Sequence, residues 1–269
     1  MTKHHANGAI YFTFDNFSRY GLTHGFFSRK GGVSTGIFES LSFSRNMGDS
    51  EEKLRENFRI AARALGFPAD DIVLTKQTHT TNLRIARPGD RGMGYDRLCG
   101  YADIDGLVTD EKNIALAAVF ADCVPLYFYD IKEKVIALSH SGWQGTAEGM
   151  ADVTIGFMAD NYNSKPENVI CGIGPAINAC CFEVDEDVHT LFRQKFDFAG
   201  HYITAGKPGK HNIDLIGINR HMLLEAGLLP ENIEAARICT CCCDRELFFS
   251  HRRDGLNRGN MGAFLTLGS

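Results

Sequence analysis

The sequence predicts an α+β fold in which helices pack on a mixed β-sheet. Segments of strand length outnumber segments with helical periodicity, and they occur in adjacent pairs as well as in alternation with helices. A regular parallel α/β fold would alternate throughout. The 269 residues contain no internal repeat, no low-complexity linker and no shift in composition. We therefore expect a single domain over residues 1–269, with enough apolar residues to bury a substantial core.

In the first third of the chain, the clearest element is a helix at 48–68. Apolar residues recur there at helical spacing, Asp49 or Ser50 can cap the start with Glu52 in the first turn, and Gly66 can end it. Short segments rich in aromatic and β-branched residues predict strands at 10–14, 22–28, 71–80 and 82–86.

The rest of the chain follows a long glycine-rich loop at 87–100. Helical periodicity returns after Gly145, and two further amphipathic segments predict helices at 185–196 and 214–227. Apolar segments predict the remaining strands at 113–121, 125–130, 134–140, 168–174, 233–241, 246–255 and 261–267.

The composition excludes several classes of protein. The formal net charge is -5 and the basic residues are scattered, so no clustered positive charge is available for a nucleic acid. No apolar run approaches the roughly 20 residues that span a bilayer. The first residues lack the pattern of a signal peptide, so we expect a cytoplasmic protein whose His4 and His5 lie in a mobile tail.

The nine cysteines form an odd set in a chain without an export signal, which favours reduced thiols over a disulfide scaffold. The pair Cys180–Cys181 and the CTCCC segment at 239–243 invite a second metal site. However, the chain has no pair of C-x-x-C knuckles at zinc-ribbon spacing. Structural thiols are therefore the favoured interpretation.

Three residues at the ends of predicted strands are candidates for one reactive site: His79, Cys123 and His140. Strand ends that open into loops commonly present reactive groups. Two imidazoles and a thiolate form a three-ligand set for zinc that leaves the fourth position open. Taken alone, however, a buried cysteine is more often a small inert hydrophobe, and a single histidine is more often only hydrogen-bonded.

Several motifs occur in an order that resembles a known family: SRKGGVSTG, QTH, DGLVT, ADCVP, HSGWQGT, GPAI…CCFEV, CT and FFSHRRDG. From about Gly21 to the C-terminus, the sequence is similar to the YfiH family, also called the laccase-domain, multicopper polyphenol oxidase-like or peptidoglycan editing factor family. The resemblance implies a YfiH-like domain with zinc bound by His79, Cys123 and His140, which would also be the catalytic residues.

The resemblance further implies a purine nucleoside phosphorylase that acts on adenosine, inosine, guanosine and methylthioadenosine and also deaminates adenosine. Its small-molecule partners would be a purine nucleoside and phosphate. An open zinc position suits deamination, because zinc lowers the pKa of water that it binds to about 7. The sequence departs from the family pattern at Gln144, where relatives often have arginine, and around Arg258.

The expected phosphate-binding groups are Arg29, Arg45 and Asn46, facing the metal. Arg29 lies beside a glycine-rich loop, and Arg45 and Asn46 precede a predicted helix N-terminus, a natural phosphate position. The resemblance favours these residues over Arg252 and Arg253, which are expected to form only surface pairs.

Two other functions remain open. A copper-dependent polyphenol oxidase could use the same three ligands, but the chain has no His-x-His pair of the kind that builds a three-copper cluster, so zinc is favoured over copper. A cysteine-type hydrolase that edits peptidoglycan precursors could use Cys123 as nucleophile and His140 as base. Beside this site, Asp122 could orient a ligand, act as a base or only cap a turn.

Overall fold

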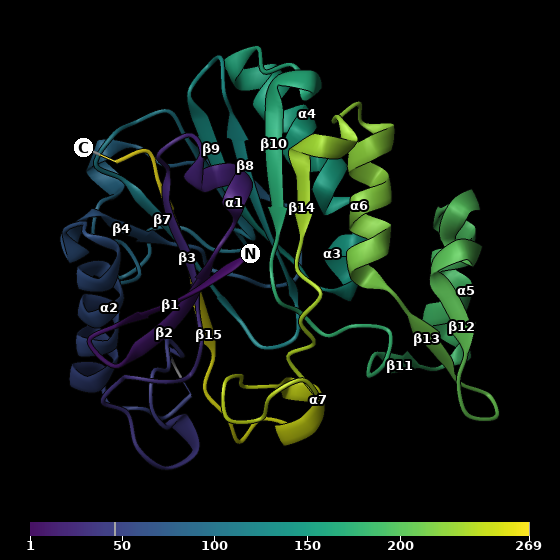
Figure 1. Ribbon diagram of the computed structural model, residues 1–269, viewed down its shortest axis with the longest axis horizontal. Coiled ribbons are helices and arrows are strands. Elements are labelled where there is room, and N and C mark those ends of the chain that lie inside the picture. The colour runs from purple at the N-terminus through teal and green to yellow at the C-terminus, as the bar shows by residue number, and fades with distance from the viewer. Residues whose placement is uncertain (46, 269) are drawn as a thin grey trace.

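The computed structural model describes residues 1–45 and 47–268 and contains two stacked six-stranded β-sheets with helices on their outer faces (Figure 1). The strand order of the first sheet is β1 (Thr2–Ala6), β2 (Ala9–Thr13), β3 (Thr23–Phe27), β15 (Met261–Thr266), β7 (Ala115–Phe120) and β4 (Ile72–Leu74). The order of the second is β14 (Ile233–Ala235), β10 (Val169–Ile173), β8 (Val124–Asp130), β9 (Val135–Ser141), β6 (Gly106–Thr109) and β5 (Leu83–Ile85).

Both large sheets are mixed, which confirms the predicted fold class. The pairs β4–β7, β5–β6 and β10–β14 are parallel, and the other pairs in these sheets are antiparallel. A third, small sheet lies at the side of the molecule next to α5 (Glu186–Lys195) (Figure 1). Its strands are β11 (Glu183–Val184), β13 (His211–Ile213) and β12 (Ile203–Ala205).

The central strands are apolar along their whole length because both of their faces are buried. In β8, Tyr127 and Tyr129 face the core between the two sheets, whereas Leu126 and Phe128 face the core beneath the helices. This second core is covered by α4 (Met150–Tyr162) and α6 (Leu215–Glu225). Successive side chains of a strand therefore supply two different cores.

The outer face of the first sheet is covered by α2 (Glu51–Leu65), the predicted helix. Leu54 and Phe58 pack in the core beneath it, and Gly66 ends the helix in a left-handed conformation. The predicted capping contact was wrong, because no side chain caps the helix N-terminus. Instead, the Asp49 carboxylate accepts hydrogen bonds from the Ser50 backbone N–H at 2.9 Å and from the Ser34 hydroxyl at 2.6 Å.

The predicted strand at 246–255 was wrong. This segment forms turns followed by the short helix α7 (His251–Asp254), whose N-cap Ser250 accepts a hydrogen bond from the backbone N–H of Arg253. Two other predicted strands are shorter in the structure than expected. The segment 71–80 forms only β4, and the segment 233–241 forms only β14.

The predicted mobile tail was also wrong, because residues Thr2–Ala6 form β1. The His4 ring stacks on Tyr11 with ring centroids 5.0 Å apart, and the Met1 amino group donates to Glu234 at 2.7 Å. The short helices α1 (Asp15–Ser18) and α3 (Trp143–Ala147) were not predicted. Within the described part of the chain, no helix has both the length and the apolar character needed to cross a membrane.

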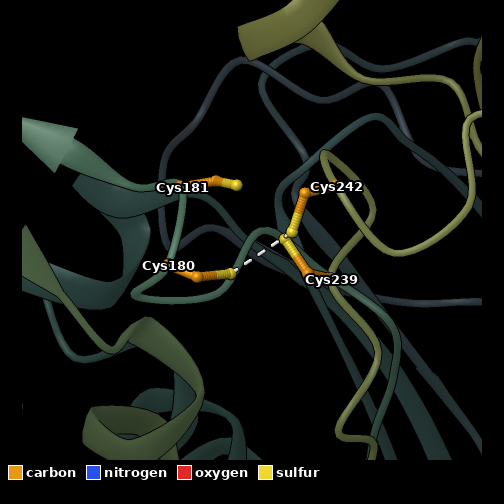
Figure 2. Close-up of side chains that lie close together, drawn as sticks. All are labelled: Cys180, Cys181, Cys239 and Cys242. Carbon is orange, nitrogen blue, oxygen red and sulfur yellow. Dashed lines mark hydrogen bonds between the residues drawn. The ribbon is translucent and has the colours of Figure 1, made fainter.

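The segments 176–181 and 239–242 lie side by side and bring several cysteine side chains close together (Figure 2). Ala176 and Cys239 form a parallel bridge, and the Thr240 N–H donates to the Ala176 carbonyl oxygen at 3.0 Å. All nine cysteines are free thiols, as expected. Four cysteines of these two segments have sulfur atoms that all lie within 4.8 Å of one another: Cys180, Cys181, Cys239 and Cys242.

Candidate functional site

The three donors predicted from the sequence come together at the ends of neighbouring strands. Cys123 directly precedes β8, and His140 lies near the end of β9, opposite Pro125 in the antiparallel pair. His79 comes from the loop after β4. One donor atom from each of the three side chains lies within 4.8 Å of the other two, and Cys123 Sγ is 3.9 Å from His79 Nε2.

The buried side chain of Asp105 positions two of the three donors. Its carboxylate accepts hydrogen bonds from the backbone N–H groups of residues 78–80, at 2.9 to 3.1 Å, and from His140 Nδ1 at 2.8 Å. These contacts hold His79 in a left-handed conformation with φ 66°, which is uncommon outside glycine. Because Nδ1 of His140 is bonded to Asp105, Nε2 is the ring nitrogen available toward Cys123.

The charges of the site support each other. Burial would raise the pKa of the Cys123 thiol, but the charge and hydrogen bonds of His140 and His79 lower it to about 6. Burial would lower the pKa of His140, but the Cys123 thiolate and Asp105 raise it to about 9. Burial likewise opposes ionisation of Asp105, yet hydrogen bonds from His140 and the backbone lower its pKa. The site therefore favours a thiolate, the form that binds metals.

Space for an ion depends on Gly142, which precedes α3. A Cβ atom at this position would lie 2.8 Å from His79 Cδ2 and 3.2 Å from Cys123 Sγ. Any larger residue would therefore push against two of the three donors. The thiolate and two imidazoles fit zinc, and this donor set is also found at copper centres.

Two of the donor residues, His79 and Cys123, line a cavity of about 450 Å³. This volume lies within the ~300–1,000 Å³ typical of small-molecule sites. The lining includes both apolar and charged side chains, and most of the charged ones come from the segment around β11, from α5 and from α7. The lining residues other than His79 and Cys123 include Trp143, Ile177, Phe182, Glu183, Asp187 and Arg252.

Asp122 connects the thiol donor to the C-terminal segment. Its carboxylate accepts hydrogen bonds from the hydroxyls of Thr240 and Ser250, at 2.7 and 2.9 Å, and from the backbone N–H of Arg252 at 2.7 Å. Asp122 has φ 86° and directly precedes Cys123. Its two carboxylate oxygens thus orient the loop next to a donor, which is one of the three roles weighed from the sequence.

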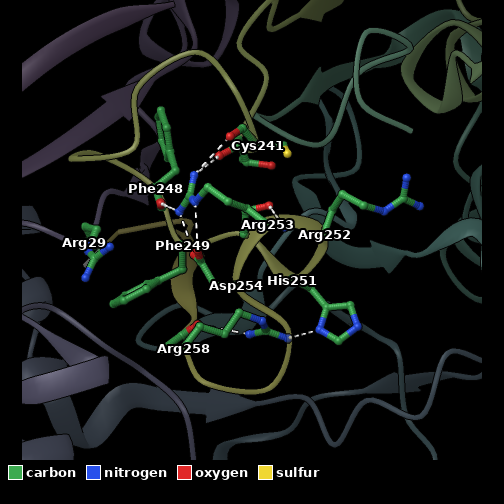
Figure 3. A network of polar contacts seen from close by, with 12 residues as sticks. Arg29, Cys241, Phe248, Phe249, His251, Arg252, Arg253, Asp254 and Arg258 are labelled. Atoms are coloured by element: carbon green, nitrogen blue, oxygen red, sulfur yellow. Dashed lines mark hydrogen bonds and ion pairs between the residues drawn. The ribbon is translucent and has the colours of Figure 1, made fainter. Parts of the chain in front are cut away.

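Arg29 does not line the cavity that contains Cys123. Its Nε donates to the Glu39 carbonyl oxygen at 2.7 Å, and its guanidinium lies 4.3 Å from the centre of the Phe249 ring. With Arg253 and Arg258 it lines a separate hollow on the other side of α7 (Figure 3). This hollow is basic, but it is not the metal-facing position expected for Arg29.

Arg45 also lies away from the cavity. It donates to the Tyr95 carbonyl oxygen at 2.7 Å, pairs with Glu51 at 3.4 Å and lines a third hollow. The third expected phosphate contact, Asn46, lies outside the described residues. The structure therefore does not bring Arg29 and Arg45 together with the three donors, and their contact with substrate stays a prediction.

Arg252 is the cavity cation that sequence reasoning set aside. Its Nη1 donates to the carbonyl oxygens of Cys181 and Glu183 at 2.9 and 2.8 Å, so it is not only a surface pair. Arg253 pairs with Asp254 at 2.7 Å, but its guanidinium also donates to the carbonyl oxygens of Cys241 and Phe248 at 3.0 and 2.8 Å, so it too forms more than a surface pair. Sequence analysis also missed Asp105 as a positioning residue. Asp105 begins the DGLVT motif, but it does not follow a predicted strand, so its position gave no sign of a role in the site.

The fold and site together define a class. Imidazole and thiol donors beside a cavity of this size are typical of enzymes that bind a metal and a small molecule. The chain belongs to the family described as multi-copper polyphenol oxidoreductase laccase, whose model matches residues 23–268.

Relatives of known name cover nearly the whole chain. It is 36% identical over 247 residues to the purine nucleoside phosphorylase YlmD of Geobacillus stearothermophilus, covering 91% of this chain and 90% of the relative. It is 34% identical over 251 residues to a purine nucleoside phosphorylase of Bacteroides thetaiotaomicron, covering 92% and 93%. The crystal structure of YlmD from G. stearothermophilus matches with a TM-score of 0.92 at 34% identity, covering 99% of this chain and 98% of the other.

Proposed function

We propose that this protein is a zinc-dependent purine nucleoside phosphorylase that also deaminates adenosine. The observation that carries the proposal is the convergence of His79, Cys123 and His140 beside a cavity large enough for a nucleoside. The names of its relatives support phosphorolysis. We infer that adenosine, inosine, guanosine and methylthioadenosine are substrates and that residues 1–269 act as one domain.

The proposed zinc site uses the residues in distinct ways. When bound, zinc with an open fourth position supplies a Lewis acid. The chain's own contribution is orientation: Asp105 directs Nε2 of His140 toward the thiol and fixes the backbone of His79. Zinc is favoured over copper because the chain contains no His-x-His pair for a three-copper cluster.

The two substrates have different requirements, and the cavity offers a group for each. The apolar side chains of Trp143, Ile177 and Phe182 can pack against a purine. Phosphate needs a cation within the same cavity, and Arg252 is the arginine that lines it. We infer that Arg252 binds the phosphate group.

A nucleoside panel tests the proposed function. The zinc-loaded protein is incubated with each nucleoside, with and without phosphate, and the products are separated. We expect free base and ribose 1-phosphate only when phosphate is present, and inosine from adenosine in both conditions. Folded, zinc-loaded protein that releases no base in the presence of phosphate would refute phosphorolysis. Absence of inosine would refute deamination alone.

A cysteine hydrolase is the second candidate, because the pKa of Cys123 is lowered to about 6 next to His140. A thiolate bound to zinc is a poor nucleophile, so metal content separates the two functions. Protein purified without added metal is analysed for zinc and copper, and its visible spectrum is recorded. Zinc bound at this site favours the phosphorylase, a metal-free active protein favours the hydrolase, and intense blue absorption favours a copper oxidase.

The phosphate contact is tested by comparing Arg252→Ala with Arg45→Ala. We expect Arg252→Ala to raise the KM for phosphate about 10-fold or more, since a charge-assisted hydrogen bond contributes about 1.5–3 kcal/mol. The KM for nucleoside should change much less. Arg45→Ala should leave both values near wild type; a raised phosphate KM in Arg45→Ala alone would instead support the position expected from the sequence.

Gly142→Ala is expected to weaken metal binding without unfolding the protein. The added Cβ would press on His79 and Cys123, while the backbone of Gly142 is extended and accepts any residue. Zinc affinity is measured by competition with a chelator. Gly156→Ala, in α4 and with open space around its Cβ, is the control. Wild-type affinity in Gly142→Ala would contradict the close packing at the site.

A further inference from the structure

Four cysteine sulfur atoms meet between the turn at 178–181 and the turn at 239–243 (Figure 2). All four lie within 4.8 Å of one another, and Cys180 Sγ and Cys242 Sγ are 3.5 Å apart. In a tetrahedral zinc site with Zn–S bonds of ~2.3 Å, the sulfur atoms are about 3.8 Å apart. The side chains therefore need only small rotations to surround one ion.

The backbone of both turns holds these thiols in place. The N–H groups of Cys181 and Phe182 both donate to the Asn178 carbonyl oxygen at 2.9 Å. The Cys243 N–H donates to the Cys239 carbonyl oxygen at 3.1 Å, which closes the turn around the C-x-x-C pair. Cys239 is buried, and its sulfur accepts the backbone N–H of Asn178 at 3.5 Å. A backbone N–H that donates to this sulfur would stabilise its thiolate form, because hydrogen bonds to ionised acceptors are stronger.

We propose that Cys180, Cys181, Cys239 and Cys242 form a structural zinc site, separate from the His79–Cys123–His140 group. Four thiols without an open position are the donor set of closed zinc sites, and soft sulfur donors select such metals. A disulfide between Cys180 and Cys242 would use only half of the cluster. The sequence favoured structural thiols because its spacing, a Cys-Cys pair and one C-x-x-C, does not match a zinc ribbon.

The position of the cluster gives the second zinc a role in the cavity. Phe182 and Glu183 follow Cys181 directly and line the cavity wall. Arg252 donates to the carbonyl oxygens of Cys181 and Glu183. A zinc ion that joins the two turns would therefore hold the wall against the segment that carries Arg252.

Metal stoichiometry is the first test. Full-length wild-type protein is saturated with zinc, dialysed against a weak chelator and analysed. We expect two zinc equivalents per chain in wild type, and one in Cys123→Ser. The double variant Cys180→Ser, Cys242→Ser, which changes two exposed thiols, should also retain one. The matched control is Cys241→Ser, Cys243→Ser, which lies in the same turn and should retain two.

Each outcome of this test decides the proposal. One equivalent in wild type, lost completely in Cys123→Ser, would overturn the second site while leaving the first intact. Loss of zinc from the control pair as well as from the cluster pair would also overturn it. The proposed enzymatic function is judged separately. It depends on the zinc ion held by His79, Cys123 and His140, which the variant Cys180→Ser, Cys242→Ser should retain.

Alkylation of native wild-type protein provides a readout that does not depend on any variant. Peptide mass spectrometry is used to compare the zinc-loaded protein with protein treated with a strong chelator. We expect Cys180, Cys181, Cys239 and Cys242 to be protected by zinc and to become reactive together when it is removed, while exposed Cys243 reacts in both samples. Full reactivity of Cys180 and Cys242 with zinc present, or a disulfide between them in protein kept reduced, would overturn the proposal.

Discussion

Cys123→Ser is expected to remove the metal from the His79–Cys123–His140 group and to abolish phosphorolysis and deamination together. A serine hydroxyl has nearly the size of the thiol but stays protonated at neutral pH, whereas zinc binds the deprotonated form. Changing a residue that hydrogen-bonds a metal ligand typically costs ~10–100-fold in metal affinity or activity, and loss of a direct donor should exceed that. Metal analysis and the nucleoside assay are performed on the same purified sample.

The control for this variant is Cys243→Ser, an exposed thiol outside both cysteine groups. It should keep full activity and the wild-type number of zinc ions. If Cys123 only packs at the strand end, Cys123→Ser should lose modest stability and keep its metal. Full activity with undiminished zinc in Cys123→Ser would end the proposal that this residue is a ligand.

Asp105→Asn is expected to have the largest effect of any change that leaves the three donors in place. The asparagine amide cannot accept all the hydrogen bonds now directed at the carboxylate by residues 78–80 and by His140. Leaving such buried donors unpaired should lower the free energy of unfolding by about 2–4 kcal/mol. Zinc affinity should fall ~10–100-fold, because the orientation of two ligands depends on this group.

Urea denaturation and chelator competition measure the two effects of Asp105→Asn. Asp103→Asn is the matched control, since it makes the same chemical change two residues earlier at an exposed position. We expect its stability and zinc affinity to stay close to wild type. Equal behaviour of the two variants would show that Asp105 does not position the donors.

The sequence was most informative where one physical requirement dominates. Helix α2 is long and has one apolar face, and the strands β7 to β9 are apolar along their length because both of their faces are buried, so the sequence pattern located all four elements. The apolar residues Phe248 and Phe249 predicted a strand, and the structure does bury both side chains. Burial alone does not fix backbone conformation, and here contacts to Asp122 turn the chain instead.

The same distinction applies to the site. His79, Cys123 and His140 were candidates because they are reactive residue types at strand ends, and the family resemblance then joined them into one site. Asp105 and Arg252 could not, because their roles depend on partners that are distant along the chain. The Asp105 carboxylate contacts His140, 35 residues away, and the Arg252 side chain contacts Cys181, 71 residues away.

One carboxylate, that of Asp122, has a consequence for how this protein can diverge. It adjoins the thiol donor on one side and accepts the backbone N–H of Arg252 on the other, so a single side chain links the backbone at Cys123 to the backbone at Arg252. Mutations near Cys123 and mutations in α7 should therefore be epistatic, with double-mutant effects that differ from the sum of the single effects. A change in the shape of the cavity beside Cys123 would therefore require coordinated substitutions in both segments, which few single substitutions can supply.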